Sequence, residues 1–228
     1  MKISWRTSVF LAAAVIGSAL ARSGDSPPLA HAYAGFPLEI DSKCRDGKAQ
    51  IFDECGDQLA LFKTALARAN LEHKVLLVEF GAEWCIWCHV FDAHINGEHH
   101  RFTYTYGTPD EPESRQTTTF KEGKGADARA ANALREFVAA NFVIVHIDAA
   151  YAPNSDHVLE ASGASERYDE TLPFIFSVDQ RGKFAQKFMS DAVEKRRDTE
   201  SDWYRGYDRA GLLAQLTSMR DAARASVP

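Results

Sequence analysis

Two cysteines three positions apart follow closely on an apolar run of strand length. The run Val75–Phe80 is interrupted only by Glu79, and Cys85 and Cys88 come shortly after it. A continuous apolar run of this length is typical of a central strand that is covered on both faces. A helix that begins at the cysteines supplies unpaired N–H groups and a partial positive charge, which stabilise the thiolate that attacks disulfides. The pattern therefore predicts a strand and a helix with a redox-active dithiol at their junction.

The first residues predict an export signal. Lys2 and Arg6 are positive, and a short apolar stretch over residues 9–20 leads to Ala21. A basic start, an apolar stretch and a small-residue end describe a secretory signal peptide, whereas a membrane span needs about 20 apolar residues. We expect residues 1–21 to be a signal peptide that is cleaved after Ala21, and the mature protein to be periplasmic or otherwise exported. An uncleaved anchor is the alternative.

The number of cysteines fits an oxidising compartment. The chain has four, and all lie after the expected cleavage point. Exported thiols pair unless something reduces them, and an even number leaves none over. The spacing suggests the local pairs Cys44–Cys55 and Cys85–Cys88. We expect Cys44–Cys55 to be a structural disulfide, with a contribution of about 3 kcal/mol in the chain-entropy model; a second redox pair that exchanges with the first is the alternative.

Composition and periodicity predict the remaining organisation. The net charge of −6 gives no indication of a nucleic-acid partner. Residues 22–55 are expected to form an N-terminal arm that begins as a linker, and residues 56–228 one folded domain. Within that domain two irregular segments interrupt the periodic pattern: an insertion at about 96–126, and residues 149–170.

The periodic segments predict an α/β domain. Helical patterns cover residues 58–70, 85–95, 127–140 and 209–225, with Asp57 and Asp208 as candidate N-caps for the first and the last. Strand patterns cover residues 75–80, 142–147, 174–178 and 183–188, and the last two flank a four-residue turn that predicts a hairpin. This order predicts a mixed central sheet covered by helices.

Three features, taken in order along the chain, resemble the thioredoxin family. The first is the strand that runs into Trp84-Cys85-x-x-Cys88. The second is Glu79 within that strand, where the family has a buried Asp. The third is Leu172-Pro173 before a strand and hairpin, where the family has its cis-proline loop. The resemblance covers roughly residues 59–225 less the two irregular segments. It implies a thioredoxin fold with an insertion after the active-site helix, and it is strongest to exported, periplasmic thioredoxin-like proteins.

The resemblance implies roles for the dithiol and the acidic residue. Cys85 is the attacking thiol, which forms a mixed disulfide with a substrate, and Cys88 then attacks Cys85 to release the substrate. Burial is expected to raise the pKa of Glu79, so that its carboxylate takes the proton of Cys88. Ile86-Trp87 stands where common thioredoxins have Gly-Pro, so the direction of electron flow stays open.

The resemblance also implies how a substrate binds. Pro173 is predicted to follow a cis bond, which places the backbone of Leu172 beside Cys85, where it can pair with an extended substrate. Trp84 and Trp87 are expected to form an apolar rim around the dithiol. The implied activity is that of a thiol–disulfide oxidoreductase on exported protein disulfides or dithiols. It needs no small cofactor, and a membrane-bound redox partner would exchange its electrons.

Three other functions fit parts of the same sequence. Cys85-x-x-Cys88-His89 matches the signature for covalent haem attachment. Cys85 and His89 also lie four positions apart, on one helix face, where they could bind copper or zinc. His94, His99 and His100 stand nearby, but we assign no metal ligands. The third is a non-catalytic fold whose insertion docks a partner protein.

Overall fold

The computed structural model describes residues 34–47, 49–99, 126–199 and 202–226. The expected signal peptide and most of the expected insertion at 96–126 lie outside these ranges. Within the described ranges, no helix has the length and apolar character that a membrane crossing needs.

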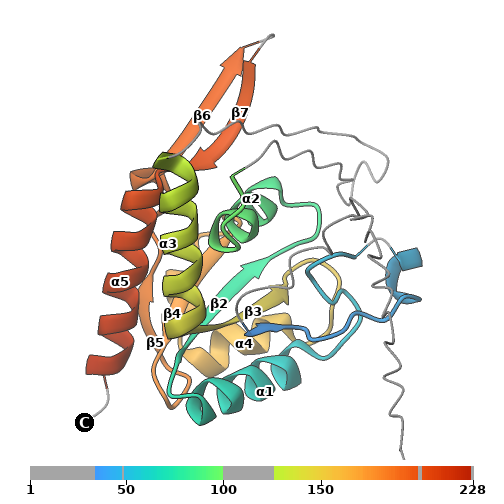
Figure 1. Cartoon of the computed structure of the whole chain (residues 1–228). Helices are drawn as coiled ribbons and strands as arrows, with labels where there is room; N and C mark the ends of the chain where they lie inside the picture. The colour runs from blue at the N-terminus through green and yellow to red at the C-terminus, as the bar shows by residue number, and fades with distance from the viewer. Residues whose placement is uncertain (1–33, 48, 100–125, 200–201, 227–228) are drawn as a thin grey trace, which may run out of the picture. The chain divides into compact units, whose positions relative to one another are not determined.

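A five-stranded mixed sheet forms the centre of the folded unit (Figure 1). Its strands, in the spatial order β1-β3-β2-β4-β5, are β1 (Ala34–Phe36), β3 (Phe142–Asp148), β2 (Val75–Gly81), β4 (Phe174–Val178) and β5 (Phe184–Lys187). β1 and β2 run parallel to β3, whereas β4 runs antiparallel to both β2 and β5.

Five α-helices flank the sheet. They are α1 (Gln58–Leu71), α2 (Ile86–Ile95), α3 (Ala126–Asn141), α4 (Ser155–Ser162) and α5 (Arg209–Ala225). Short 3₁₀ turns occur at η1 (Cys44–Gly47), η2 (Ser165–Arg167) and η3 (Ser190–Ala192). A separate two-stranded ribbon, β6 (Glu194–Thr199) and β7 (Asp202–Tyr207), precedes α5.

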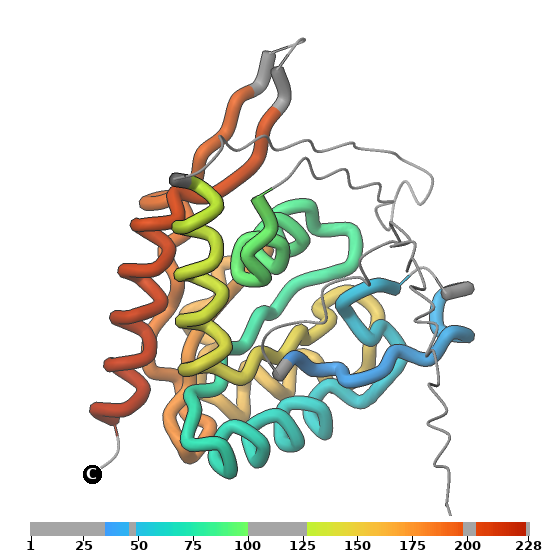
Figure 2. The backbone as a smooth tube through the Cα atoms, in the orientation of Figure 1, coloured from blue at the N-terminus to red at the C-terminus, as the bar shows by residue number. Residues whose placement is uncertain are grey.

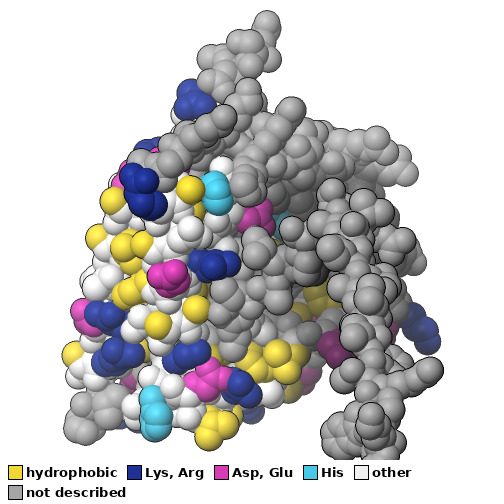
Figure 3. All heavy atoms as spheres, in the orientation of Figure 1, with side chains coloured by type: hydrophobic (Ala, Val, Ile, Leu, Met, Phe, Trp, Pro, Cys, Tyr) yellow, Lys and Arg dark blue, Asp and Glu magenta, His cyan; other side chains and the backbone are white. Residues whose placement is uncertain are grey.

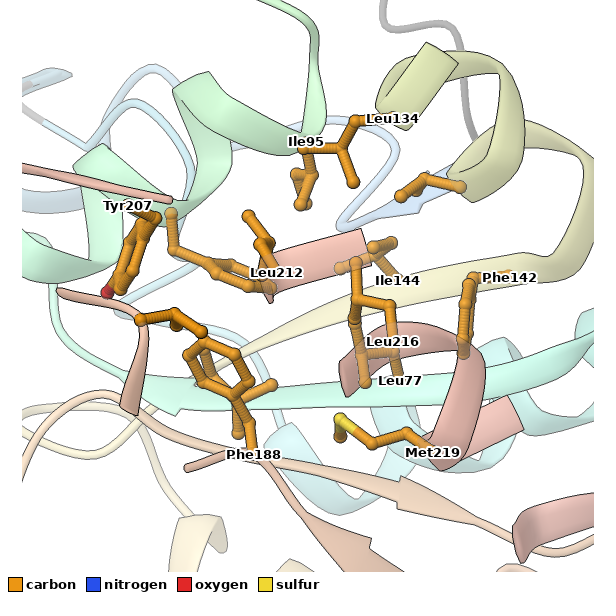
Figure 4. Packing of buried hydrophobic residues seen from close by; sticks show 14 of the residues in the cluster. Leu77, Ile95, Leu134, Phe142, Ile144, Phe188, Tyr207, Leu212, Leu216 and Met219 are labelled. Atoms are coloured by element: carbon orange, nitrogen blue, oxygen red, sulfur yellow. The ribbon is translucent and has the colours of Figure 1, made fainter. Parts of the chain in front are cut away.

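The strands bury both of their faces because alternate side chains point to opposite sides. Leu76, Val78 and Phe80 of β2 pack with α1 and α4, in a core that includes Phe62 and Val158. The intervening side chains of β2 and β3 pack with α2, α3 and α5. Figure 4 shows this second core, where side chains of the sheet meet those of α5; its labelled members include Leu77, Ile144, Leu212, Leu216 and Met219.

The structure confirms the predicted α/β architecture and its longer elements. The expected helices and strands are present with ends that move by one residue. Both candidate caps form: the Asp57 carboxylate accepts a hydrogen bond from the Ala60 N–H at 2.9 Å, and the Asp208 carboxylate accepts one from the Gly211 N–H at 2.8 Å. These elements were predictable because their signals are local: a cap residue, an apolar stripe and a turn.

Three elements differ from the prediction. The expectation that residues 149–170 are irregular is wrong, because they contain α4, an eight-residue helix that buries only Val158, Leu159 and Ser162. The ribbon β6–β7 was not predicted, because its first strand, EKRRDT, has no apolar alternation. The linker expected at the start of the arm ends in β1, which pairs with β3, as the adjacent tubes in Figure 2 show. The sheet therefore begins inside the segment assigned to the arm.

The surface visible in Figure 3 mixes charges of both signs. Lys and Arg side chains alternate with Asp and Glu, and hydrophobic side chains lie between them, over the side that carries α3 and α5. Charges of opposite sign that are interspersed in this way produce no single-sign field over that face.

Candidate functional site

Cys85 and Cys88 lie at the start of α2 and form a disulfide. Their Cα atoms are 5.3 Å apart. Cys85 is the N-cap of the helix, and its Sγ accepts a hydrogen bond from the Cys88 N–H at 3.2 Å. A sulfur that already accepts a helix-terminal N–H is placed to be stabilised as a thiolate once the disulfide is reduced. The local sequence therefore folds as expected, with the dithiol at the junction of β2 and α2.

An apolar cavity of about 470 Å³ opens beside Cys85. Its lining residues come from three segments: Trp84, Cys85, Ile86, Trp87, Ala149, Ala150, Tyr168, Glu170 and Leu172. The Leu172–Pro173 bond is cis, as expected. Cys85 is 5% exposed whereas Cys88 is fully buried, so only one sulfur of the disulfide faces this cavity. A thiol that enters the cavity therefore meets Cys85 first.

Asp148, the last residue of β3, positions the part of the cavity wall that Ala149 and Ala150 form. Its carboxylate accepts backbone hydrogen bonds from Ala150, Tyr151 and Ala152 at 3.2, 2.6 and 2.8 Å. These bonds determine the turn that carries Ala149 and Ala150 to the cavity. The Asp148 side chain therefore positions this part of the wall.

The two tryptophans contribute differently to the rim. Both line the cavity, as expected. Trp87 also packs against the ring of Tyr207, with centroids 5.4 Å apart, and the guanidinium of Arg205 lies 5.8 Å from the centroid of the Trp87 ring. Trp87 thus connects the dithiol to β7, which the sequence did not predict. Both tryptophans also pack with the cluster around the two cysteines.

The loop closed by the Cys44–Cys55 disulfide packs against the buried side of the dithiol. Phe52, near the end of this loop, is fully buried and clusters with Cys85 and Cys88. A Cβ atom built on Gly81 would lie 2.7 Å from the Cys88 Sγ and 2.8 Å from the Phe52 ring. Glycine is therefore required here because the strand, the sulfur and the ring meet more closely than a side chain permits.

Glu83 anchors this loop. Its Oε2 accepts hydrogen bonds from the backbone N–H groups of Ile51 and Phe52, both at 3.1 Å. His89 Nε2 donates to the Glu83 carbonyl at 2.7 Å, which ties the first turn of α2 to the same residue. Burial by itself would raise the pKa of Glu83, but the hydrogen bond and charge of His89, with the backbone N–H groups, hold it below its usual value. Glu83 therefore stays ionised and keeps the loop attached.

Glu79 is fully buried, as expected, and it has a partner that was not expected. His146 of β3 is the residue opposite Glu79 in the β2–β3 register, and its Nδ1 lies 3.0 Å from Glu79 Oε2. Asp92 of α2 lies on the other side of the ring, with its Oδ1 3.7 Å from His146 Nε2. Burial raises the pKa of Glu79, and the hydrogen bond to His146 opposes that rise. One buried carboxyl group, one imidazole and one further carboxylate thus lie side by side.

A signal for His146 was present in the sequence. Glu79 is the fifth residue of the seven-residue strand β2, and His146 is the fifth residue of the seven-residue strand β3. Each is the first polar residue of its strand, after four apolar residues. Alignment of the two strands as parallel neighbours in register would have predicted the pair. The local pattern by itself indicates an isolated strand histidine, and the structure shows that this interpretation is wrong.

The histidines that suggested a metal site are used in other ways. His94 is fully buried; its Nδ1 lies 2.8 Å from the Val90 carbonyl, and its Nε2 accepts a hydrogen bond from the Tyr207 N–H at 3.2 Å. Burial, and then the charge of Arg209, lower the pKa of His94 to about 3. His99 lies beside the Gly97 carbonyl, at 3.1 Å. Across the described ranges, no group of three or more His, Cys, Asp or Glu side chains is arranged to hold a metal ion, and His100 lies outside them.

Glu54 is a buried acid in the same loop. This buried carboxylate lies 3.5 Å from the guanidinium of Arg45. Burial, followed by the negative charge of Asp148, raises the pKa of Glu54 to about 7 against the lowering effect of Arg45, and Glu83 adds to the rise. A carboxyl group whose pKa is raised on folding stabilises the native state fully below its unfolded pKa, and that contribution is lost as the pH rises through the folded value.

We predict that Glu54→Gln removes one part of this pH dependence. The free energy of unfolding of the unmodified protein should fall relative to that of the variant as the pH rises from about 4.5 to about 7, and the difference should then level off. Chemical denaturation at several pH values measures it. Glu160→Gln, an exposed carboxylate on α4, is the control. Parallel pH curves for Glu54→Gln and the unmodified protein would show that Glu54 has no raised pKa.

Comparison with known proteins adds no assignment. No protein-family model matches the chain, and no curated protein matches it significantly. The geometry around Cys85 and Cys88 is therefore the basis for assigning a function.

Proposed function

We propose that this protein is a thiol–disulfide oxidoreductase that exchanges disulfides with other proteins through Cys85 and Cys88. The observation that carries the proposal is the Cys85–Cys88 disulfide at the N-terminus of α2, with only Cys85 facing an apolar cavity. A dithiol at a helix N-terminus favours a nucleophilic thiolate, and an apolar cavity suits an extended segment of a partner protein. In this function Cys85 attacks and Cys88 resolves the mixed disulfide.

The proposal includes a thioredoxin fold over residues 56–228, preceded by the arm at 22–55. The strand order β1-β3-β2-β4-β5, with β4 and β5 antiparallel, supports it. So do a cis Pro173 whose preceding residue lines the cavity beside Cys85, and a buried acid in the strand before the dithiol. In this fold Trp84, Leu172 and Pro173 bind the substrate, and Glu79 takes the proton of Cys88.

The setting of the reaction is also part of the proposal. The export signal expected over residues 1–21, together with four cysteines in the exported part, supports a periplasmic or otherwise extracytoplasmic location. The substrates would be protein disulfides or dithiols in that compartment, and a membrane-bound redox partner would restore the dithiol. The chemistry uses sulfur alone and needs no small cofactor.

The test is the redox equilibrium of Cys85 and Cys88. A Cys44→Ala/Cys55→Ala variant, equilibrated in glutathione buffers and followed by Trp84 and Trp87 fluorescence, should show one reversible two-electron transition. A potential of about −270 mV would make the protein a reductant, and one of about −120 mV a disulfide donor. A disulfide that stays closed across the whole range, with no exchange on any protein disulfide or dithiol, would refute the proposed function.

A further inference from the structure

Glu79 and His146 lie on the face of the sheet that carries Cys88. Side chains of a strand alternate between faces, so Glu79 shares a face with Gly81. The Cβ direction of Gly81 leads directly to the Cys88 Sγ. Positions two apart on a strand are separated by about 6.6 Å, so Glu79 is the next residue of β2 on the face that meets Cys88. Oε1 of Glu79 is buried and makes no hydrogen bond in the described structure.

His146 connects this buried carboxyl group to a second cavity. A cavity of about 420 Å³ lies at the β1 edge of the sheet, and His146 is part of its lining. The other lining residues come from segments 35–40 and 49–51. The cavity that holds Cys85 has a different lining, and the two share no residue. A space of this size accommodates several water molecules. One ring nitrogen of His146 thus lies next to Glu79, and the ring also lines this second cavity. A proton that leaves through His146 reaches water there without passing the cavity at Cys85.

The charges around His146 favour a proton on this pair. Burial by itself would lower the pKa of His146, but the hydrogen bond to Glu79 and the negative charges of Glu79, Asp92 and Glu83 raise it above its usual value. These acids come from β2, from α2 and from the turn between them, and Phe52 packs on the ring edge-on, with centroids 5.5 Å apart. A buried carboxyl–imidazole pair of this kind titrates as a unit.

We propose that His146 exchanges the proton of Glu79 with water in the cavity at the β1 edge, so that Glu79 can accept the proton of Cys88 while a substrate fills the other cavity. This inference rests on the proposed function, because it assigns a path to the proton that the resolving step must release. His146 acts through Glu79 and is therefore a positioning residue, whereas Glu79 receives the proton itself.

The step balances in protons and electrons. The pair starts with Glu79 as a carboxylate and His146 as an imidazolium. Oε1 of Glu79 takes the S–H proton of Cys88, and the His146 imidazolium gives up one ring proton to water in the cavity and becomes neutral. The Cys88 thiolate then attacks the Cys85 Sγ. The Cys85–substrate S–S bond breaks, its electron pair leaves on the substrate sulfur, and that sulfur takes a proton from solvent. The substrate disulfide is thereby reduced to two thiols, and Cys85 and Cys88 are oxidised to a disulfide.

The experiment separates the two thiol steps in the full-length protein. Reduced protein is mixed rapidly with an aromatic disulfide that releases one coloured thiolate when Cys85 attacks it and a second when Cys88 resolves the adduct. In His146→Asn the side-chain amide can still donate to Glu79, but it cannot carry a proton. We expect its second phase to slow about a hundredfold near neutral pH, the low end of what a positioned acid–base group contributes, and to lose its dependence on pH. The first phase should not change.

A second variant distinguishes proton exchange from packing. His146→Gly leaves a space that added imidazole or pyrazole can fill, and the two rings have the same shape, but pyrazole stays neutral at these pH values. Imidazole should restore the second phase and pyrazole should not. His157→Asn, which removes an exposed histidine on α4, is the matched control and should behave as the unmodified protein.

The outcomes distinguish this inference from the function on which it rests. Absence of the first phase would refute the proposed function, since Cys85 would not react. A normal first phase with an unchanged second phase and pH profile in His146→Asn would overturn the role of His146 alone. Equal rescue of His146→Gly by imidazole and by pyrazole would also overturn it, because filling the space would then be sufficient.

Discussion

Cys85→Ser should lose thiol–disulfide exchange almost completely, whereas Cys88→Ser should stop at the mixed disulfide. Serine at position 85 keeps the size of the side chain, but its hydroxyl is hardly ionised and is a weak nucleophile. We expect exchange to fall by roughly a thousandfold or more, as when other enzyme nucleophiles are removed. The sulfur of Cys85 borders the apolar cavity, whereas that of Cys88 is buried. Cys88 should therefore not replace Cys85 as the attacking thiol.

The Cys88→Ser variant tests the order of the two attacks. Cys85 can still form a bond with a substrate, but the buried sulfur that would break this bond is absent. A covalent adduct should therefore accumulate, and its mass, together with its loss on adding a dithiol reductant, measures it. Adduct formation by Cys85→Ser in place of Cys88→Ser would reverse the assignment.

Removal of the other disulfide is the matched control for both variants. Cys44→Ser/Cys55→Ser leaves Cys85 and Cys88 in place and should retain exchange. It should lower the free energy of unfolding by about 3 kcal/mol, because the loop closed by Cys44–Cys55 is then unconstrained in the unfolded chain. Loss of exchange in this variant, with Cys85→Ser still active, would make Cys44–Cys55 the redox pair.

Phe52→Ala should destabilise the protein by about 3–5 kcal/mol, the range for truncating a fully buried phenylalanine. The ring lies between the strand that ends at Gly81, the sulfur of Cys88 and the imidazole of His146. These neighbours belong to a strand, a disulfide and a second strand, so they cannot move together to fill the space. The cost should therefore fall in this range and not below it.

Two measurements check this prediction. Chemical denaturation gives the change in the free energy of unfolding. The rate at which a small alkylating reagent modifies Cys88 in the reduced protein should also rise, because the Phe52 ring packs in the same cluster as this buried sulfur. Leu38→Ala is the control, since this side chain of the N-terminal segment is 74% exposed and its truncation should change stability by less than about 0.5 kcal/mol. A Phe52→Ala variant as stable as Leu38→Ala would show that the loop does not pack on the dithiol.

The pair Glu79 and His146 illustrates how far the sequence could be interpreted. The burial of Glu79 was predictable because its neighbours on the strand are apolar. Its partner was missed, because the two residues are 67 positions apart and only an in-register alignment of β2 with β3 brings them together. The same reason hid Phe52: the segment around it is polar, and the residues that hold its loop and cover its ring, Glu83 and His146, are distant in the sequence.

The sequence by itself determined the elements whose signals are local. The strand before Cys85, the helix after it, the N-caps Asp57 and Asp208 and the α/β class all follow from periodicity, capping and turn residues that lie within a few positions of one another. Only the tertiary structure decided which residues surround the dithiol. Strand pairing and loop packing bring together Phe52, Glu79 and His146, and such contacts depend on the relative positions of distant segments, which no local pattern specifies.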